Sequence, residues 1–555
     1  MSGDLFLFVY NDQFGKIRNQ AQANVTSLSD QLCTVELLNL QNEELLAMTY
    51  PDGTPTWEPL DVAGEFLTTV AVRTILNHIG LPFVAIGESQ VLNQDMDSLG
   101  VQASDTFMIG ISTTFIFDVY TLETLIHQLK SQFPNVPVLI GGAGFTLNPD
   151  WFAQCSADFG LFGDAEEALH AFVEVFCNGR DFAAVPNLYY KTPFGSVCPG
   201  QRRDIDIDTA PTPIWDQGRG WPSRIWYESL RGCPFRCKFC SYPQQSPDWR
   251  VKSADRMFEE WMYYAENGVR YITCLDSTML TPPTRMKRFC ELLIQHQSPI
   301  QWNCWGHPSQ LQSFELIELM AAAGCCSLSM GVESGDDHIL KNMSKFVSRT
   351  KSLRAIEYAK RAGLFTIGNF MIGFPGETQT SIDHTRQLIL EAAPDIYSTQ
   401  AFQIRDRHMP ILAEAGAYHL DIQYDAHGVY QSWQHETMSS QQAEQFVHDF
   451  EYQLLHQATR SLSFWSTRAM GFRLSRGATK PQLTSYRQQH LNPLMKELER
   501  AAAYHPMTQT PYNIATCLST SRRYAQTARL ALSQELKNDR LVSPQSHQLI
   551  QKLEA

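Results

Sequence analysis

The sequence lacks the features of an exported or membrane-anchored chain. Its first ten residues contain the apolar run Leu5–Tyr10, but no basic residue precedes the run and no small-residue cleavage pattern follows it. A run this short also cannot cross a bilayer. We therefore interpret it as a buried first strand and expect a cytoplasmic protein with no membrane partner.

A disulfide framework is equally unsupported. The chain has 13 cysteines, an odd number, and its 555 residues far exceed the small secreted domains that disulfides stabilise. Hydrophobic residues make up 43% and charged residues 18%, which is an ordinary globular composition. The length predicts three or four domains. Without a disulfide framework, the thiols are expected to be free to bind metal.

Basic residues are scarce in the first part of the chain. Residues 1–200 hold 6 Lys and Arg against 23 Asp and Glu, a net charge of −17, whereas the remainder carries +3. A general nucleic-acid binder needs a basic surface. The charge therefore argues against a nucleic-acid partner and separates two regions of different character.

Short apolar strands alternate with helices in the N-terminal region, which predicts an α/β, doubly wound (Rossmann-like) parallel sheet. Strands are expected at 4–10, 83–87, 106–112 and 136–140, and helices at 62–79, 120–133 and 165–176. Ligands of such sheets bind beyond the strand carboxyl ends. The candidate binding residues there are Ser112, Thr113, Thr114, Gly141, Gly142 and Gly144. A glycine pair after a strand is also common for turn geometry alone.

A second alternating block follows a linker rich in Asp, Pro and Gly. Six strands are expected at 224–229, 270–275, 300–305, 326–332, 365–372 and 396–402, with helices between them. Six such units predict a partial (β/α)6 TIM-like barrel. The expected domains are 1–205, a linker at 206–222, a core at 223–405 and a mainly helical region at 406–555.

Three cysteines stand together after the first strand of this block: Cys233, Cys237 and Cys240. Thiolates suit iron–sulfur clusters, zinc and copper. A closed zinc site needs a fourth ligand at matching spacing, and none follows nearby. Three ligands leave one metal position open for chemistry. Three core or zinc thiols are the alternative, and buried structural thiols are the default for the other ten cysteines.

The Cys-x3-Cys-x2-Cys spacing in this position resembles the radical S-adenosylmethionine (SAM) superfamily. The resemblance implies that Cys233, Cys237 and Cys240 hold a [4Fe-4S] cluster whose open iron binds SAM. Positions matched in order imply that SAM is contacted by Tyr242, Asp276, Glu333, Ser334, Gly373 and Phe374. Asp276 stands in for the usual Gly-Gly-Glu, and Glu333 could instead pair with a Lys or Arg of the barrel.

A doubly wound sheet before such a core is the layout of the cobalamin-binding subfamily. The segments around Ser112, Gly141 and Gly163 resemble that domain, although Asp164 and Ala165 depart from its Gly-Glu-Gly-Glu pattern. The resemblance implies cobalamin bound by Ser112, Thr113, Thr114, Gly141, Gly142 and Gly144. The histidine of the corrinoid motif is absent near Asp12, so a cobalt without a lower histidine ligand is expected.

The resemblance implies an enzyme that methylates an unactivated centre of a small molecule, through methylcobalamin and a 5′-deoxyadenosyl radical. An external flavodoxin- or ferredoxin-type electron donor is expected as a partner. Cyclisation or rearrangement without methyl transfer is the alternative, and a non-catalytic corrinoid carrier is a third reading. A tRNA methylthiotransferase is discounted because Cys33, Cys155, Cys177 and Cys198 are scattered. No single residue is singled out as catalytic.

Overall fold

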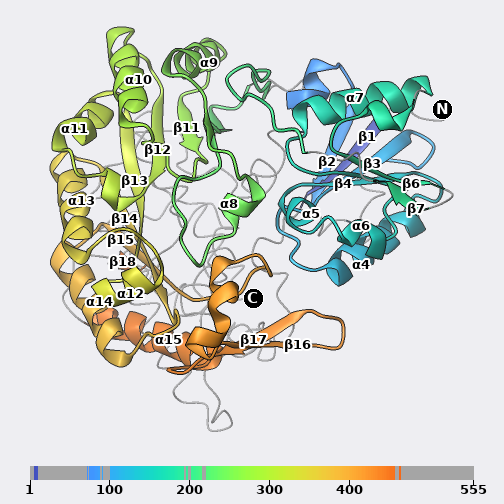
Figure 1. The fold of residues 1–555 in the computed structure, drawn as a ribbon. Coiled ribbons are helices and arrows are strands. Elements are labelled where there is room, and N and C mark those ends of the chain that lie inside the picture. The colour runs from blue at the N-terminus through green and yellow to red at the C-terminus, as the bar shows by residue number, and fades with distance from the viewer. Residues whose placement is uncertain are drawn as a thin grey trace, which may run out of the picture.

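The computed structural model describes two α/β units joined by a linker (Figure 1). The residues described are 5–10, 72, 74–87, 91, 101–179, 181–192, 195–197, 202–215, 221–456 and 462–463. The residues around Asp12 and the part of the helical C-terminal region beyond 463 lie outside this set, as does most of the helix expected at 62–79. The N-terminal unit lies beside the open side of the second unit.

The N-terminal unit has a seven-stranded sheet in the order β2-β1-β3-β4-β5-β6-β7. Its strands are β1 (Leu5–Tyr10), β2 (Phe83–Gly87), β3 (Thr106–Ser112), β4 (Val138–Gly141), β5 (Phe159–Leu161), β6 (Leu188–Thr192) and β7 (Gly195–Val197). The first five are parallel, and β6 and β7 continue antiparallel. Every residue of β3 is buried, as expected for a central parallel strand covered on both faces.

Helices cover both faces of this sheet (Figure 1). They are α4 (Val119–Gln132), α5 (Ala143–Leu147), α6 (Trp151–Gln154) and α7 (Glu166–Asn178). Asp118 caps α4 by accepting from the backbone N–H of Thr121, and Gly179 ends α7 in the left-handed conformation. The doubly wound prediction is confirmed, whereas β5–β7 and the short helices α5 and α6 were not predicted.

The second unit is a parallel sheet curved into a partial barrel, in the order β18-β15-β14-β13-β12-β11-β8. Its strands are β8 (Arg224–Tyr227), β11 (Tyr271–Cys274), β12 (Gln301–Gly306), β13 (Cys325–Glu333), β14 (Phe365–Ile372), β15 (Ile396–Ala401) and β18 (Leu462–Ser463). The first six occupy the six predicted positions. Strand β18 was not predicted and pairs with β15 from well beyond the expected core boundary.

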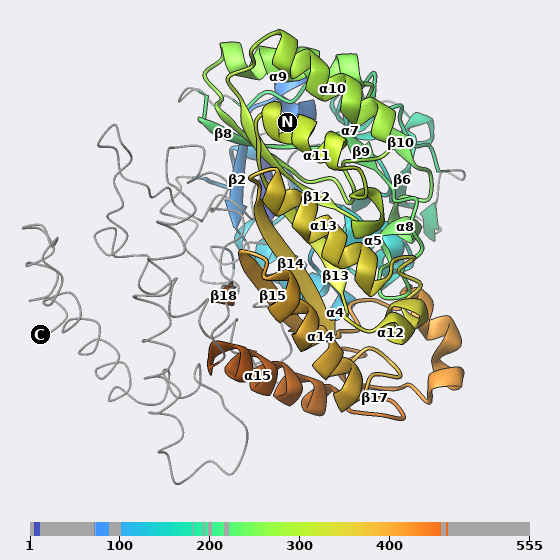
Figure 2. The same ribbon diagram turned by 90° about the vertical axis from the view of Figure 1, so that its left-hand side faces the viewer.

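An outer layer of helices follows the barrel strands (Figure 2). They are α9 (Ala254–Glu266), α10 (Pro283–Gln295), α11 (Phe314–Ala322), α12 (Asp337–Asn342), α13 (Arg349–Arg361) and α14 (Gln379–Ala392). Ser253 caps α9 and Ser348 caps α13 through their hydroxyl groups. A large apolar core between helices and strands includes the fully buried Trp261 and Trp302.

The described C-terminal region is less helical than predicted. It holds a 3-10 segment η6 (Pro410–Tyr418), a hairpin of β16 (Asp421–Tyr424) and β17 (Tyr430–Gln434), and helix α15 (Ser440–His456). The hairpin turns at Asp425, which accepts from the backbone N–H groups of His427 and Val429. This local Asp and Gly turn chemistry favours a hairpin over a continued helix.

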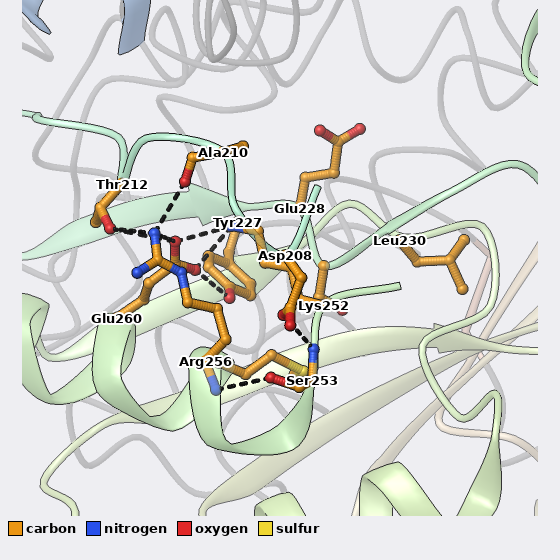
Figure 3. Close-up of polar contacts among 12 residues, drawn as sticks. Asp208, Ala210, Thr212, Tyr227, Glu228, Leu230, Lys252, Ser253, Arg256 and Glu260 are labelled. Carbon is orange, nitrogen blue, oxygen red and sulfur yellow. Dashed lines mark hydrogen bonds and ion pairs between the residues drawn. The ribbon is translucent and has the colours of Figure 1, made fainter. Parts of the chain in front are cut away.

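The described part of the linker is fastened to the second unit through a buried carboxylate (Figure 3). Glu260 on α9 is 1% exposed and accepts from the hydroxyl of Tyr227 at 2.5 Å and the ammonium of Lys252 at 2.7 Å. Arg256 lies 3.2 Å from Glu260 and donates to Ala210 and Thr212 of the linker. Buried charges need such partners. The hydrogen bonds of Arg256 to Ala210 and Thr212 therefore fix this part of the linker against α9.

Candidate active site

The three clustered cysteines lie on one loop, between the two-stranded ribbon of β9 (Leu230–Arg231) and β10 (Arg250–Val251) and the short helix α8 (Tyr242–Gln245). Cys237 is buried, and Cys233 and Cys240 are half-buried. Gly232 begins the loop with a φ of +80°, where a Cβ would meet the carbonyl oxygen of Asp248 at 2.7 Å. The loop therefore requires glycine just before the first cysteine.

The cysteine loop is held at its middle by two other segments. The Lys238 N–H donates to the Met343 carbonyl at 2.9 Å, and the Lys238 carbonyl accepts from Ile411 N–H at 3.0 Å. The Lys238 ammonium pairs with Glu414 at 2.6 Å. These contacts keep the three thiols on a fixed backbone.

The donor set fits a cluster better than a single metal ion. The pKa of Cys237 is raised to about 12, mainly by burial; Lys345 acts to lower it, and the nearby Glu333, Cys240 and Cys233 make smaller raising contributions. Within the described residues, no group of three or more His, Cys, Asp or Glu could hold one metal ion. A [4Fe-4S] cluster binds each thiolate through a separate iron, so its ligands need not converge on one point. Metal binding would stabilise the thiolate form of these cysteines, which burial disfavours.

Glu333 lies at the end of β13, beside the cysteine loop. Its carboxylate accepts from the Lys345 ammonium at 2.9 Å, and that ammonium also lies over the Phe239 ring at 5.6 Å from the centroid. The ion pair expected as the alternative for Glu333 is therefore present. Glu333 also has a φ of +66°, a strained conformation for a non-glycine residue that is typical of functional sites.

Asp276 follows β11 and supports the start of the cysteine loop. It is 2% exposed, and its carboxylate accepts from Ser229 N–H at 2.7 Å, from Leu230 N–H at 2.9 Å and from the Ser229 hydroxyl. Burial raises the pKa of Asp276 to about 6, against the lowering effect of Arg285. Both carboxylate oxygens are thus engaged within the protein, and the predicted SAM contact of Asp276 stays a prediction.

Ser334 is likewise engaged within the protein. Its hydroxyl lies 3.3 Å from that of Thr385 and accepts from Asp336 N–H at 3.1 Å. Ser334 is fully buried. Its side chain therefore shapes the turn after β13, and its predicted SAM contact stays a prediction that the backbone would have to fulfil.

The turn after β14 is packed from two sides. Gly373 has a φ of +96°, its N–H donates to the buried carboxyl of Glu377 at 2.5 Å, and its carbonyl accepts from His435 at 3.0 Å. Phe374 is buried against Phe402. The predicted SAM segment at Gly373 and Phe374 is therefore positioned by Glu377 within its own turn and by the C-terminal hairpin.

The six predicted cobalamin residues divide into two groups. Ser112, Thr114, Gly141 and Gly142 line a pocket at the carboxyl edge of the N-terminal sheet. Thr113 instead donates to the Gly141 carbonyl at 2.7 Å and accepts from Phe145 N–H at 2.8 Å. A Cβ at Gly144 would lie 2.5 Å from the Thr113 carbonyl oxygen. Thr113 and Gly144 therefore build the loop beneath the pocket.

The pocket is formed by both units and encloses about 1240 Å³, counting the part open to solvent. The N-terminal unit contributes an apolar floor that includes Phe6, Phe8 and Leu161, and the second unit contributes Glu228, Arg231, Tyr242, Gln245, Ser246 and Leu275. Helix α8 lies against α5 at this border (Figure 1). Glycines at the rim and an apolar floor suit a large, flat ligand with an apolar body.

Tyr242 links the pocket to the cysteine loop. It opens α8 only two residues after Cys240 and lines the pocket. Burial raises the pKa of Tyr242, so its hydroxyl remains protonated and can donate. The pocket wall at Tyr242 therefore lies next to the cysteine loop, so a ligand bound in the pocket would lie near that loop.

Sequence reasoning missed the charged residues that join the units. Arg231 pairs with Asp164 at 3.0 Å and with Glu166 at 2.5 Å, and Arg250 also pairs with Asp164. Burial acts to raise the pKa of Asp164, but Arg231 and Arg250 together hold it below its ordinary value. The departure of Asp164 and Ala165 from the family pattern was the available signal.

Comparison with known proteins assigns both units. Residues 227–389 match the Radical SAM superfamily, and residues 88–173 match the B12 binding domain. The structure resembles TsrM, a radical S-adenosylmethionine methyltransferase from Kitasatospora setae solved with cobalamin and a [4Fe-4S] cluster. The TM-score is 0.61 at 15% identity, covering 90% of this chain and 100% of that one.

Curated relatives cover part of the chain. An uncharacterized methyltransferase from Pyrococcus horikoshii is 28% identical over 51% of this chain and 64% of its own length. An anaerobic magnesium-protoporphyrin IX monomethyl ester cyclase from Rubrivivax gelatinosus is 24% identical over 50% of this chain and 53% of its own length. The chain thus spans between half and two thirds of these relatives.

The chain therefore carries a B12-binding domain followed by a radical SAM domain. Together these two domains indicate a [4Fe-4S] cluster, SAM and cobalamin as the cofactors. Methyltransferases and a cyclase both occur among its relatives. Within the described residues, no helix is long and apolar enough to cross a bilayer.

Proposed function

We propose that the protein transfers a methyl group to an unactivated centre of a small-molecule substrate. The observation that carries the proposal is the shared pocket, which joins the loops after β3, β4 and β5 to the helix that follows the cysteine loop. When bound, cobalamin and SAM would supply a transferable methyl group and a hydrogen-abstracting radical. A pocket lined by both domains would bring these reactive groups together and restrict the access of water.

The chain's own residues have positioning roles in this proposal. Cys233, Cys237 and Cys240 would hold the cluster, and the Ser112 and Gly142 loops would hold the corrin edge. The strained Glu333, which pairs with Lys345, would accept hydrogen bonds from hydroxyl or ammonium groups of SAM. Radical formation requires an electron, so an external flavodoxin- or ferredoxin-type donor is part of the proposal.

Atom balance gives the proposal a definite signature. One SAM donates its methyl group and leaves S-adenosylhomocysteine, and a second SAM takes the substrate hydrogen and leaves 5′-deoxyadenosine and methionine. Two electrons from the external donor complete each cycle. A cyclase or rearrangement enzyme would produce 5′-deoxyadenosine without S-adenosylhomocysteine.

The test uses the full chain reconstituted with iron, sulfide and cobalamin, together with a chemical reductant and SAM carrying a trideuterated methyl group. We expect trideuteromethylcobalamin and S-adenosylhomocysteine to form, as detected by mass spectrometry. Formation of 5′-deoxyadenosine with unlabelled cobalamin would instead support the cyclase alternative. Absence of every SAM product would support a corrinoid carrier.

Substrate candidates can be screened with the same label. Tryptophan is named as substrate in a TsrM structure, and magnesium-protoporphyrin IX monomethyl ester in the cyclase relative. A product heavier by one trideuterated methyl group identifies both the substrate and the reaction. A mass change in a probe without the label contradicts methyl transfer for that probe.

A further inference from the structure

Two arginines of the cysteine-loop ribbon face each other across its strands. Arg231 on β9 is the cross-strand partner of Arg250 on β10, and their side chains are 14% and 15% exposed. Like charges directly opposite on a ribbon repel each other, and burial strengthens that repulsion. The ribbon that leads into Cys233 is therefore stable only if anions lie next to both guanidinium groups.

Anions from the other domain meet this requirement. Asp164 pairs with Arg231 through one carboxylate oxygen and with Arg250 through the other. Glu166 receives two hydrogen bonds from the Arg231 guanidinium, at 2.5 and 3.1 Å. Both acidic side chains are less than a tenth exposed. Arg231 also pairs at 2.9 Å with Glu228, which belongs to the second unit, as Arg231 does.

Asp164 is also held firmly in its own domain. Its carboxylate accepts from Ile205 N–H at 3.0 Å, and the preceding Gly163 donates to the Thr146 hydroxyl at 3.0 Å. Gly163 and Asp164 line the cobalamin pocket together with Arg231 and Ser246. The Ser246 hydroxyl in turn accepts from Arg250 at 3.2 Å. One carboxylate thus joins the wall of the pocket to the ribbon of the cysteine loop.

The far end of the cysteine loop has a second tie to the B12-binding domain. The Ser241 hydroxyl donates to Asp406 at 2.5 Å, and Asp406 accepts from His408 N–H at 2.7 Å. The His408 ring lies 3.1 Å from the side-chain oxygen of Asn148. The neighbouring Arg407 pairs with Asp150, but that pair is about half exposed and contributes little. The buried tie at Asp164 is therefore the stronger restraint.

We propose that Asp164 is a positioning residue that sets the spacing between the cobalamin pocket and the cysteine loop by holding Arg231 and Arg250 together. Domains in one chain move relative to each other unless their interface restrains them. Without the Asp164 charge, the paired arginines repel and the ribbon separates from the pocket wall. The proposal rests on the two cofactor sites and is independent of methyl transfer.

The test measures domain separation in the full chain. Spin labels on non-natural amino acids replace His170 on α7 and Arg288 on α10, whose side chains are 56% and 53% exposed. Pulsed electron resonance then gives the distance distribution for the wild type, D164N, D164E and E167Q. Glu167 is the matched control, because it pairs with Arg203 of its own domain at 3.2 Å and is exposed.

We expect the width of the distance distribution to increase about two-fold in D164N. The width should be unchanged in E167Q and close to that of the wild type in D164E, which keeps the negative charge. The measurement is repeated without cobalamin, so that weakened cobalamin binding does not remove the readout. If D164N does not fold, E166Q removes part of the same tie and should widen the distribution less. A wild-type distribution in D164N, or in E166Q where that variant replaces it, overturns the proposal.

A second readout follows the cofactors directly. In holoenzyme with retained iron and cobalamin, reducing the cluster enhances the spin relaxation of cob(II)alamin in a distance-dependent way. We expect this enhancement to fall several-fold in D164N and to persist in E167Q. Equal enhancement in D164N and wild type would overturn the proposal even if methyl transfer were established. If methyl transfer fails but the distance distribution is narrow and depends on Asp164, the proposal for Asp164 still holds.

Discussion

The strained residue Glu333 shows how one position can combine local and global demands. Its left-handed backbone is unfavourable by about 1–3 kcal/mol for a non-glycine residue. The buried Lys345 ammonium compensates its charge at 2.9 Å and lies near the cysteine loop. A conformation maintained at that expense beside a cofactor loop indicates a functional position.

At the same scale, mutation can test whether the three predicted cluster ligands differ from the remaining cysteines. We expect C233A, C237A and C240A each to lose most of the roughly four irons per chain that a [4Fe-4S] cluster supplies. C177A is the control, because Cys177 is exposed on α7, away from the cysteine loop. Iron and sulfide analysis after anaerobic reconstitution measures the effect. Full iron content in any of the three variants removes that residue from the ligand set.

Glu377 should make stability depend on pH. Burial raises its pKa from the ordinary 4.5 to about 8, so the folded protein keeps a proton that the unfolded chain releases. The free energy of unfolding therefore falls by up to about 1.4 kcal/mol per pH unit between these two values, and the fall ends above pH 8. Relative to E377Q, which carries no charge, the wild-type Tm should decline from pH 5 to pH 8. Parallel Tm curves would show that Glu377 is not protonated.

At the scale of elements, the turn after β14 depends on a C-terminal hairpin that lies far away in sequence. A Cβ at Gly373 would lie 2.5 Å from the Cβ of Ala443 on α15 and 3.1 Å from the Trp433 ring on β17. Trp433 also donates to the Phe402 carbonyl at 3.0 Å and stacks on His435. The hairpin and α15 therefore act as a wall for the predicted SAM segment.

Gly373→Ala should disrupt this wall. The clash and the positive φ together predict a destabilisation of about 2 kcal/mol or more, with weaker SAM binding. Gly416→Ala is the control, because a Cβ there has nothing within 4 Å. Thermal unfolding and SAM titration of the reconstituted protein measure both effects. Equal behaviour of the two variants would mean that the wall has no role in SAM binding.

The order of elements was predictable because hydrophobic periodicity is a local property. The six barrel strands were placed correctly, since each apolar run is bounded by turn residues. The hairpin of β16 and β17 was missed within a region predicted to be helical. Strand β18 was missed because its two residues are a strand only by pairing with β15. Short strands of this kind have no sequence signal of their own.

At the scale of the whole molecule, the uneven charge acquires a structural meaning. The acidic N-terminal domain meets basic residues of the second unit at Asp164 and Glu166 on one side, and at Asp150 on the other. Tyr120 on α4 also stacks on His427 in the hairpin turn at 4.5 Å. The domains are therefore joined on both sides of the cysteine loop, and part of the acidic excess is neutralised there.

The sequence by itself determined the two domain types, and it predicted the cysteine loop and four residues that line the pocket shared by both units, because these follow from spacing and periodicity along the chain. Only the tertiary structure decided which predicted residues are already engaged. Asp276 accepts a hydrogen bond from Ser229, and Thr113 and Gly144 lie beneath the pocket. The joint between Asp164 and Arg231 likewise connects residues distant in the chain. Such pairings depend on how the domains pack, and spacing along a chain does not encode packing.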